Sequence, residues 1–235
     1  MRTGVLERLL ADNDRHVERL AESLDAEVVS EREPPVVSVC CTDAAVPQPG
    51  PWRVGGGQLY TSTTMGNQVW DADVGETIVD SGILFPLHHR GAETIAIVGH
   101  TKCWAVKAAY NFVTGGQLPS PLGVEKRIEL LVPVVEQALD SEAVWTNGSD
   151  GAEDLPEAVL NQLVEFNVHH QVDYLDDAPE IPDDVTLLGF VYDALGVVGN
   201  RGRAYLVNVD GERDPEKNAE MAPAQFEEAV VSFLR

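Results

Sequence analysis

The chain has 235 residues, 44% of them hydrophobic and 6% aromatic, so it is long enough to bury a sizeable core and its composition excludes wholesale disorder. Asp and Glu number 39 against 16 Lys and Arg, which gives a formal net charge of -23. This charge argues against nucleic acid or an anionic membrane as a partner, because both ligands need a basic surface. We interpret the acidic side chains as a solvated surface of the halophilic type, whose self-repulsion is screened by salt.

The N-terminal segment and the cysteines indicate the cellular compartment of the protein. Charged residues interrupt the leucines of residues 1–10, so this segment lacks the apolar run of a signal peptide, and no run of 18 apolar residues occurs elsewhere. Three cysteines, two of them adjacent, do not suit a disulfide framework. We therefore expect a cytoplasmic protein in which the cysteines serve metal or thiol chemistry, built as one domain over residues 1–235 with residues 1–33 as an N-terminal helical arm.

The first half of the chain predicts strands that alternate with helices. A leucine stripe from Leu6 to Leu24 predicts an amphipathic helix that lies on another surface, a second subunit being the candidate. The further expected elements are a buried strand at Val36–Cys40, a loop at Pro47–Gly57, a weaker strand at Gln58–Thr61, a helix at Ile78–His89 that Pro86 breaks or kinks, a clear strand at Thr94–Gly99 and a helix at Cys103–Val113.

The second half continues the alternation. It predicts helices at Glu125–Leu139 and at Pro156–Leu175 with Asp154 as a cap, strands at Thr186–Tyr192 and Ala204–Val209, and a closing helix at Pro223–Leu234. Strands that alternate with helices indicate an α/β fold with a central, mainly parallel β-sheet flanked by helices. Such sheets bind ligands at the carboxyl ends of their strands.

Two of the predicted strands end in metal-ligating residues. Cys41 follows the first strand, and His100 and Cys103 follow the strand at Thr94–Gly99 in a His-x-x-Cys arrangement. Thiolate and imidazole are the ligands that zinc prefers, and three protein ligands leave the fourth position for water. The sequence therefore predicts one Zn²⁺ held by Cys41, His100 and Cys103. On these residues alone, two buried thiols and a hydrogen-bonded turn histidine remain the alternative.

The segments around these residues resemble the β-class carbonic anhydrase family. Cys41-Thr42-Asp43 after an apolar strand and Val-Gly-His-Thr-Lys-Cys at residues 98–103 carry the likeness. Further matches are the turn Met65-Gly66-Asn67, the helix from Asp80 to Ala92, the segment Asn167–Val172 and the strand Gly189–Asp193. Together they span most of the chain in the order of the family pattern.

The resemblance implies a zinc enzyme that reversibly hydrates carbon dioxide to bicarbonate and a proton, through hydroxide formed on zinc near neutral pH. It implies a homodimer or homotetramer built with exchanged N-terminal helices. Asp43 would accept a hydrogen bond beside the metal and orient the attack, its alternative being a strand-end cap. The implied substrate pocket contains Tyr60, Met65, Gly66, Asn67 and Phe85. For the apolar members of this set, ordinary core packing is the alternative.

The sequence departs from the family at three places. Ala45 stands where the family has an arginine that pairs with the aspartate, Thr63-Thr64 replaces Arg-Asn, and Trp104 replaces a glycine. Without the arginine, Asp43 is able to turn onto zinc and displace the water. Arg53, Arg90, Arg201 and Arg203 are the candidates for a replacement cation. Two other functions therefore stay open: a zinc-binding homologue without hydratase activity, and a hydrolase of carbonyl sulfide or carbon disulfide.

Overall fold

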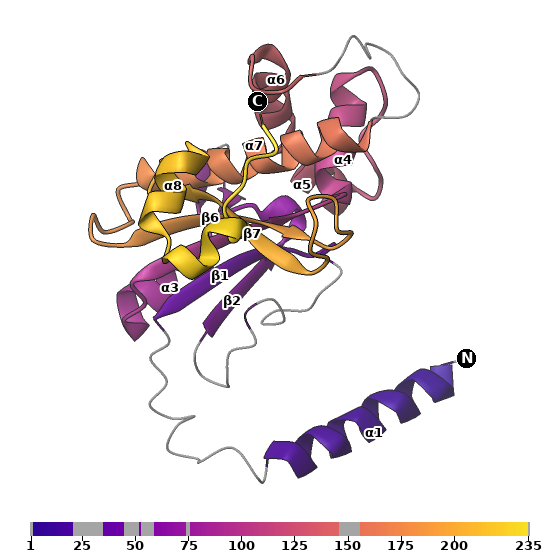
Figure 1. The fold of residues 1–235 in the computed structure, drawn as a ribbon. Coiled ribbons are helices and arrows are strands. Elements are labelled where there is room, and N and C mark those ends of the chain that lie inside the picture. The colour runs from indigo at the N-terminus through magenta and orange to yellow at the C-terminus, as the bar shows by residue number, and fades with distance from the viewer. Residues whose placement is uncertain are drawn as a thin grey trace.

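A five-stranded sheet forms the centre of the molecule (Figure 1). The structure is a computed structural model that describes residues 2–20, 35–44, 52, 59–73, 76–145 and 156–234. The strand order is β2-β1-β5-β6-β7. The strands are β1 (Val36–Cys41), β2 (Leu59–Thr64), β5 (Thr94–His100), β6 (Thr186–Asp193) and β7 (Arg203–Val209). Strands β2, β1, β5 and β6 run parallel to one another, and β7 pairs antiparallel with β6. This confirms the predicted mainly parallel sheet.

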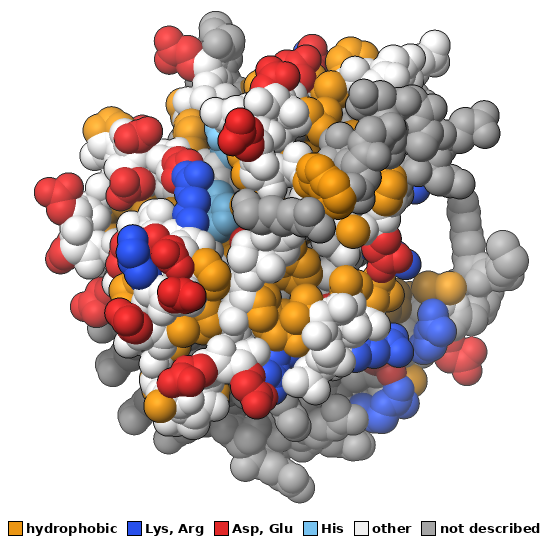
Figure 2. Space-filling model, turned by 45° about the horizontal axis from the view of Figure 1, so that its top comes forward, with side chains coloured by type: hydrophobic (Ala, Val, Ile, Leu, Met, Phe, Trp, Pro, Cys, Tyr) orange, Lys and Arg blue, Asp and Glu red, His pale blue; other side chains and the backbone are white. Residues whose placement is uncertain are grey.

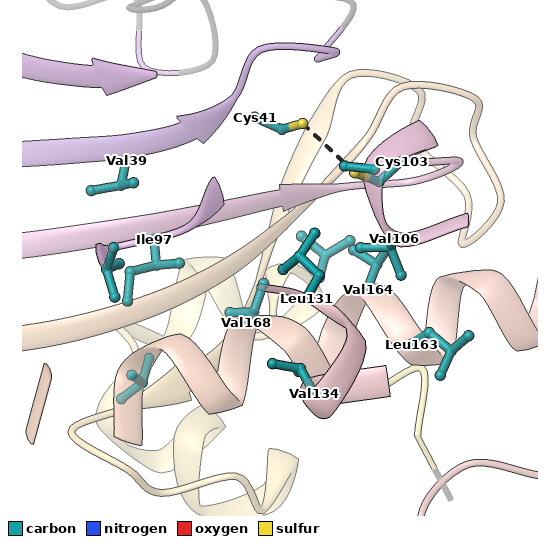
Figure 3. Packing of buried hydrophobic residues seen from close by; sticks show 14 of the residues in the cluster. Val39, Cys41, Ile97, Cys103, Val106, Leu131, Val134, Leu163, Val164 and Val168 are labelled. Carbon is teal, nitrogen blue, oxygen red and sulfur yellow. Dashed lines mark hydrogen bonds between the residues drawn. The ribbon is translucent and has the colours of Figure 1, made fainter. Parts of the chain in front are cut away.

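One face of the sheet is covered by the long helix α7 (Glu157–Asp176), which packs on β5 and β6. The strands approach this helix closely because two of them carry glycine there. A Cβ atom at either Gly99 or Gly189 would lie 2.8 Å from a methyl group of Val168. Helices α4 (Trp104–Val113), α5 (Leu122–Glu129) and α6 (Val132–Asp140) pack beside α7, and Figure 3 shows the buried aliphatic side chains between them and the sheet.

The other face is covered near β7 by α8 (Pro215–Met221) and the 3₁₀ helix η2 (Ala224–Ala229). An apolar groove of about 660 Å³ lies between them and the sheet, lined among others by Leu188, Phe190 and Phe226. The remaining elements are the hairpin β3 (Trp70–Asp73) and β4 (Glu76–Val79), the turn η1 (Met65–Asn67) and helix α3 (Ser81–Arg90), which packs on β1 and β2.

Helix α1 (Arg2–Leu20) lies apart from the sheet (Figure 1). Its apolar side chains at Val5, Leu6, Leu9, Leu10 and Val17 are at least half exposed. The predicted amphipathic helix is therefore present as far as Leu20, with these apolar side chains uncovered in the single chain, and Leu24 lies outside the described residues. None of the described helices is long and apolar enough to cross a membrane.

The structure corrects three predicted elements and adds others. The single helix at Glu125–Leu139 is two helices, because Pro133 cannot donate to the carbonyl four residues back and its ring would clash there. The closing helix predicted at Pro223–Leu234 is the shorter 3₁₀ helix η2, which ends at Ala229, and residues 230–234 are not helical. In the helix predicted at Ile78–His89, Ile78 belongs to β4, and Asp80 caps a helix that continues through Pro86. Hairpin β3–β4 and helix α8 were not predicted.

The strand predicted at Gln58–Thr61 extends to Thr64. The predicted cap Asp154 and much of the loop Pro47–Gly57 lie outside the described residues, and Pro156 precedes the first residue of α7.

Candidate metal centre

The carboxyl ends of β1 and β5 bring Cys41, His100 and Cys103 together. Cys41 is the last residue of β1, His100 is the last residue of β5, and Cys103 immediately precedes α4. One potential ligand atom from each side chain lies within 4.8 Å of the other two, and all three residues are buried. The convergence predicted from the strand ends is therefore present.

The two sulfurs face each other. The Sγ atoms of Cys41 and Cys103 are 3.6 Å apart, as the dashed line in Figure 3 marks. The backbone N–H of Gly66 also donates to the Cys41 sulfur, over 3.2 Å. Two thiol groups this close, and not in a disulfide, are arranged as a pair of metal ligands would be.

One ring nitrogen of His100 makes a hydrogen bond, and the other makes none with the described residues. Its Nδ1 lies 3.1 Å from the carbonyl oxygen of Thr101, and a carbonyl can only accept, so Nδ1 carries the proton. Nε2 is buried and has no hydrogen-bond partner among the described residues. A buried imidazole nitrogen with a free lone pair beside two thiols fits a metal ion, which would satisfy it.

The thiol pair is electrostatically unequal. The hydrogen bond from Cys103 and the nearby His100, against the opposing effect of burial, lower the pKa of Cys41 to about 4. The same hydrogen bond and complete burial raise the pKa of Cys103. The positive charge of a bound metal would favour the thiolate form of both sulfurs.

Asp43 is held by the first turn of α4. Its Oδ2 accepts a hydrogen bond of 2.9 Å from the backbone N–H of Trp104, the first residue of that helix. The N-terminus of a helix carries a partial positive charge and stabilises a carboxylate there. The Asp43 backbone N–H also lies 3.4 Å from the Cys41 sulfur.

A small cavity of about 220 Å³ opens beside these groups. Its lining consists of Cys41, Thr42, Asp43, Met65, Trp104 and Ala105. Of the predicted pocket residues, Met65 therefore lines this cavity, while Gly66 and Asn67 lie buried in the adjoining turn. Tyr60 and Phe85 contact each other edge to face, with ring centroids 6.4 Å apart, and neither lines this cavity in the described part of the single chain.

The candidate replacement cations have other partners. Arg90 lies over the ring of Phe85, Arg201 donates to the carbonyl of Ala194, and Arg203 pairs with Glu228. Ala45 and Arg53 lie outside the described residues. The group that contacts the Asp43 side chain in the described part of the chain is thus the N-terminus of α4.

The sequence pattern did not reveal the contacts around the ligands. The Thr101 carbonyl orients His100, and the turn after β2 supplies the N–H to Cys41. Asn167 and Gln171 support that turn from α7. Two carboxamides spaced i and i+4 on a helix face that is otherwise buried and apolar were the available signal.

These features define an α/β metalloprotein with a thiolate and imidazole site at the carboxyl ends of its central strands. A family model described as carbonic anhydrase matches residues 36–195, which include all three candidate ligands. The chain belongs to the β-class carbonic anhydrase family. Enzymes of this family use zinc, and the Cys41, His100 and Cys103 group could hold that ion.

Solved structures show the same fold. A tetrameric β-carbonic anhydrase from Sordaria macrospora has a TM-score of 0.68 at 14% identity, covering 88% of this chain and 98% of its own. The β-carbonic anhydrase CafA of Aspergillus fumigatus has a TM-score of 0.67 at 18% identity, covering 97% and 99%. The Coccomyxa β-carbonic anhydrase in complex with acetazolamide has a TM-score of 0.64 at 17% identity, covering 91% and 90%. No curated protein sequence matches the chain significantly.

Proposed function

We propose that the protein is a zinc-dependent carbonic anhydrase that catalyses the reversible hydration of carbon dioxide to bicarbonate and a proton. The observation that carries the proposal is the 2.9 Å hydrogen bond from the Trp104 backbone N–H to Asp43. In this chain the N-terminus of α4 takes over one role of an arginine at position 45: it donates a hydrogen bond to the Asp43 carboxyl group and holds it in one orientation. The absence of that arginine is then compatible with catalysis.

The residues around the cavity have distinct roles in this proposal. Cys41, His100 and Cys103 would hold zinc, which when bound would supply a nucleophile from water near neutral pH. Asp43 accepts a hydrogen bond from the attacking group and fixes its direction. Met65 and Trp104 give the cavity apolar walls, which suit carbon dioxide because it is uncharged and apolar. Tyr60 and Phe85 remain predicted pocket residues.

The direct test is stopped-flow measurement of carbon dioxide hydration by the full chain in molar salt. We expect acceleration that a chelator abolishes and added Zn²⁺ restores. A rate no faster than buffer from zinc-loaded protein would refute the proposal and favour a zinc-binding homologue without hydratase activity. Faster turnover of carbonyl sulfide or carbon disulfide than of carbon dioxide, measured in parallel, would instead identify a hydrolase of sulfur analogues.

The role of Asp43 is tested by Asp43→Asn, which keeps the shape of the side chain and removes its charge. We expect the hydration rate to fall by about 10²-fold or more, the range for a lost proton-directing group, with zinc content unchanged. Asp140→Asn, at an exposed aspartate on α6, is the control and should leave the rate as it is. Ala45→Arg should stay within the same order of magnitude as the parent, because α4 already holds the carboxylate. A variant with arginine that gained activity over an inactive parent would contradict this.

We further propose that the chain is one domain with a helical arm at residues 1–33 and that it forms at least a homodimer through that arm. The uncovered apolar face of α1 supports this, since Leu6, Leu9 and Leu10 are each more than half exposed. A relative from Sordaria macrospora is tetrameric. Sedimentation equilibrium distinguishes dimer from tetramer, and Leu9→Glu should shift the population toward monomer. None of the three cysteines is in a disulfide, which suits a reducing cytoplasm.

A further inference from the structure

The turn η1 approaches the metal centre with its backbone. The Gly66 N–H donates to the Cys41 sulfur over 3.2 Å. Gly66 has a φ of +73°, and a Cβ atom there would lie 2.6 Å from a methyl group of Leu131. The positive φ favours glycine at this position, and any larger side chain would also displace the Leu131 methyl group.

Helix α7 holds the adjoining peptide group of the turn, between Gly66 and Asn67. The Nδ2 of Asn167 donates to the Gly66 carbonyl over 3.0 Å and lies 3.3 Å from Oδ1 of Asn67. The Nε2 of Gln171 donates to Oδ1 of Asn167 over 2.9 Å, and Oε1 of Gln171 accepts from the Val69 N–H over 2.9 Å. Gly66 therefore links α7 to the metal-ligating sulfur: its carbonyl accepts from Asn167 and its N–H donates to Cys41.

The side-chain amides of Asn167 and Gln171 are both buried. Asn167 is 1% exposed and Gln171 is fully buried. A buried amide is costly unless its hydrogen bonds are made, and an aliphatic side chain of similar size would fill the same space without that cost. What these amides do that an aliphatic residue cannot is fix the orientation of the peptide groups of η1.

We propose that Asn167 and Gln171 are positioning residues, which aim the Gly66 N–H at Cys41 and thereby tune that sulfur as a metal ligand. Hydrogen bonds to a ligating sulfur draw charge away from it and are one of the means by which proteins adjust a bound metal. The inference rests on the proposed function only in that Cys41 binds metal; it does not require hydratase activity.

The experiment uses the full chain loaded with Co²⁺, whose thiolate charge-transfer absorption reports on the ligating sulfurs. We expect Asn167→Ala to move this band to lower energy, because a sulfur without the N–H bond gives up its electrons more easily. We also expect Co²⁺ to bind about 10- to 100-fold more weakly, the usual effect of losing an outer partner of a metal ligand. Gln171→Met should shift both quantities in the same direction and by less.

Matched controls separate positioning from general stability. Gln162→Met makes the same change in the same helix, at a buried glutamine whose Oε1 accepts from the Trp145 N–H. Asn218→Ala removes a fully buried asparagine on α8. Both should lower the melting temperature and leave the cobalt spectrum and affinity unchanged. If Asn167→Ala does not fold, the cobalt spectra and Co²⁺ affinities of Gln171→Met and Gln162→Met are compared instead, and only Gln171→Met should differ from the parent.

An unchanged charge-transfer band in Gln171→Met or a folded Asn167→Ala, or an equal shift in the controls, would overturn the proposal. The two proposals fail separately. If the charge-transfer band shifts in the variants but the zinc-loaded parent does not hydrate carbon dioxide, the proposed enzyme activity is refuted and this inference stands.

Discussion

At the scale of single residues, Asp193 stabilises the chain next to the histidine ligand. Its buried carboxylate accepts backbone N–H groups of Leu195, Gly196 and Val198 at 2.8 to 3.2 Å. The Thr101 hydroxyl also donates to it over 3.5 Å, and the carbonyl of Thr101 accepts from His100. Asp193 is thus two hydrogen bonds removed from the metal centre.

The charge of Asp193 makes this contribution depend on pH. Burial raises the pKa of Asp193, but the N–H groups of the following loop outweigh it and leave the pKa below its usual value. A carboxyl whose pKa is depressed on folding contributes stability above its unfolded pKa of about 3.9 and loses it as the pH falls through the lower folded value. The stability of the protein should therefore depend on Asp193 at neutral pH and no longer in strong acid.

Asp193→Asn should lower the free energy of unfolding at pH 7 by about 1.5–3 kcal/mol, the range for a hydrogen bond to a charged group. The difference from the parent should stay constant down to about pH 5 and narrow below about pH 4. Urea unfolding between pH 7 and pH 3 measures it, with Asp140→Asn as the exposed control. A difference that did not change with pH would show that the charge of Asp193 is not what stabilises the loop.

At the scale of elements, the C-terminal segment is tied across the edge of the sheet to α7. The Val231 N–H donates to the Leu206 carbonyl of β7. Beyond it, the carboxyl group of Glu165 on α7 accepts from the backbone N–H groups of Phe233 and Leu234 and from the Ser232 hydroxyl. Glu165 is fully buried, so these donors replace the water that would otherwise solvate it. The segment also covers the edge strand β7, which limits pairing with other chains.

Glu165→Gln should release this segment, because a neutral amide accepts less strongly and brings two donors into a site built of donors. We expect faster hydrogen exchange at Phe233 and Leu234 and a loss of about 1–3 kcal/mol in unfolding free energy. Hydrogen-exchange mass spectrometry of the C-terminal peptide measures the first and urea unfolding the second. Glu136→Gln, exposed on α6, serves as the comparison, and unchanged protection of the C-terminal peptide in Glu165→Gln would contradict the role given to Glu165.

The elements that were predictable from sequence are those with a strong local pattern. Strands β1 and β5 are short runs rich in β-branched residues, and α7 is a 20-residue helix that Pro156 immediately precedes. The hairpin β3–β4 was missed because its residues are acidic and few. Helix α8 had an available signal, since Asp214-Pro215 is a cap followed by a proline in the first turn. The split between α5 and α6 was readable at Pro133.

The same division applies to the metal centre. The ligands were predictable because strand ends converge by topology, so Cys41 and His100 meet without any knowledge of loop conformation. The contacts that tune them were not predictable. The Gly66 carbonyl and the Asn167 amide that donates to it are 101 residues apart in sequence, and the direction of the Gly66 N–H depends on turn geometry that sequence patterns do not give.

At the scale of the whole molecule, the main feature is the large excess of negative charge. The formal net charge is -23, and acidic side chains spread over much of the face shown in Figure 2. Like charges on a compact surface repel one another, and unfolding relieves the repulsion by moving them apart. Raising the salt concentration from 0.1 to 1 M shortens the screening length from about 10 Å to about 3 Å. The folded state should therefore gain stability over this range.

We expect the melting temperature to rise between 0.1 and 1 M KCl, by about 2–4 °C for each kcal/mol of repulsion that is screened. Salt also strengthens apolar burial, so a control with fewer charges is needed to isolate the electrostatic part. A variant that neutralises the exposed carboxylates Glu129, Glu136, Asp140 and Asp176 as amides serves this purpose. It should melt higher than the parent at 0.1 M and rise less steeply with KCl, since fewer repulsive pairs remain to be screened. Equal slopes for the two proteins would mean that the salt effect comes from apolar burial and that the acidic surface does not limit the stability of this fold.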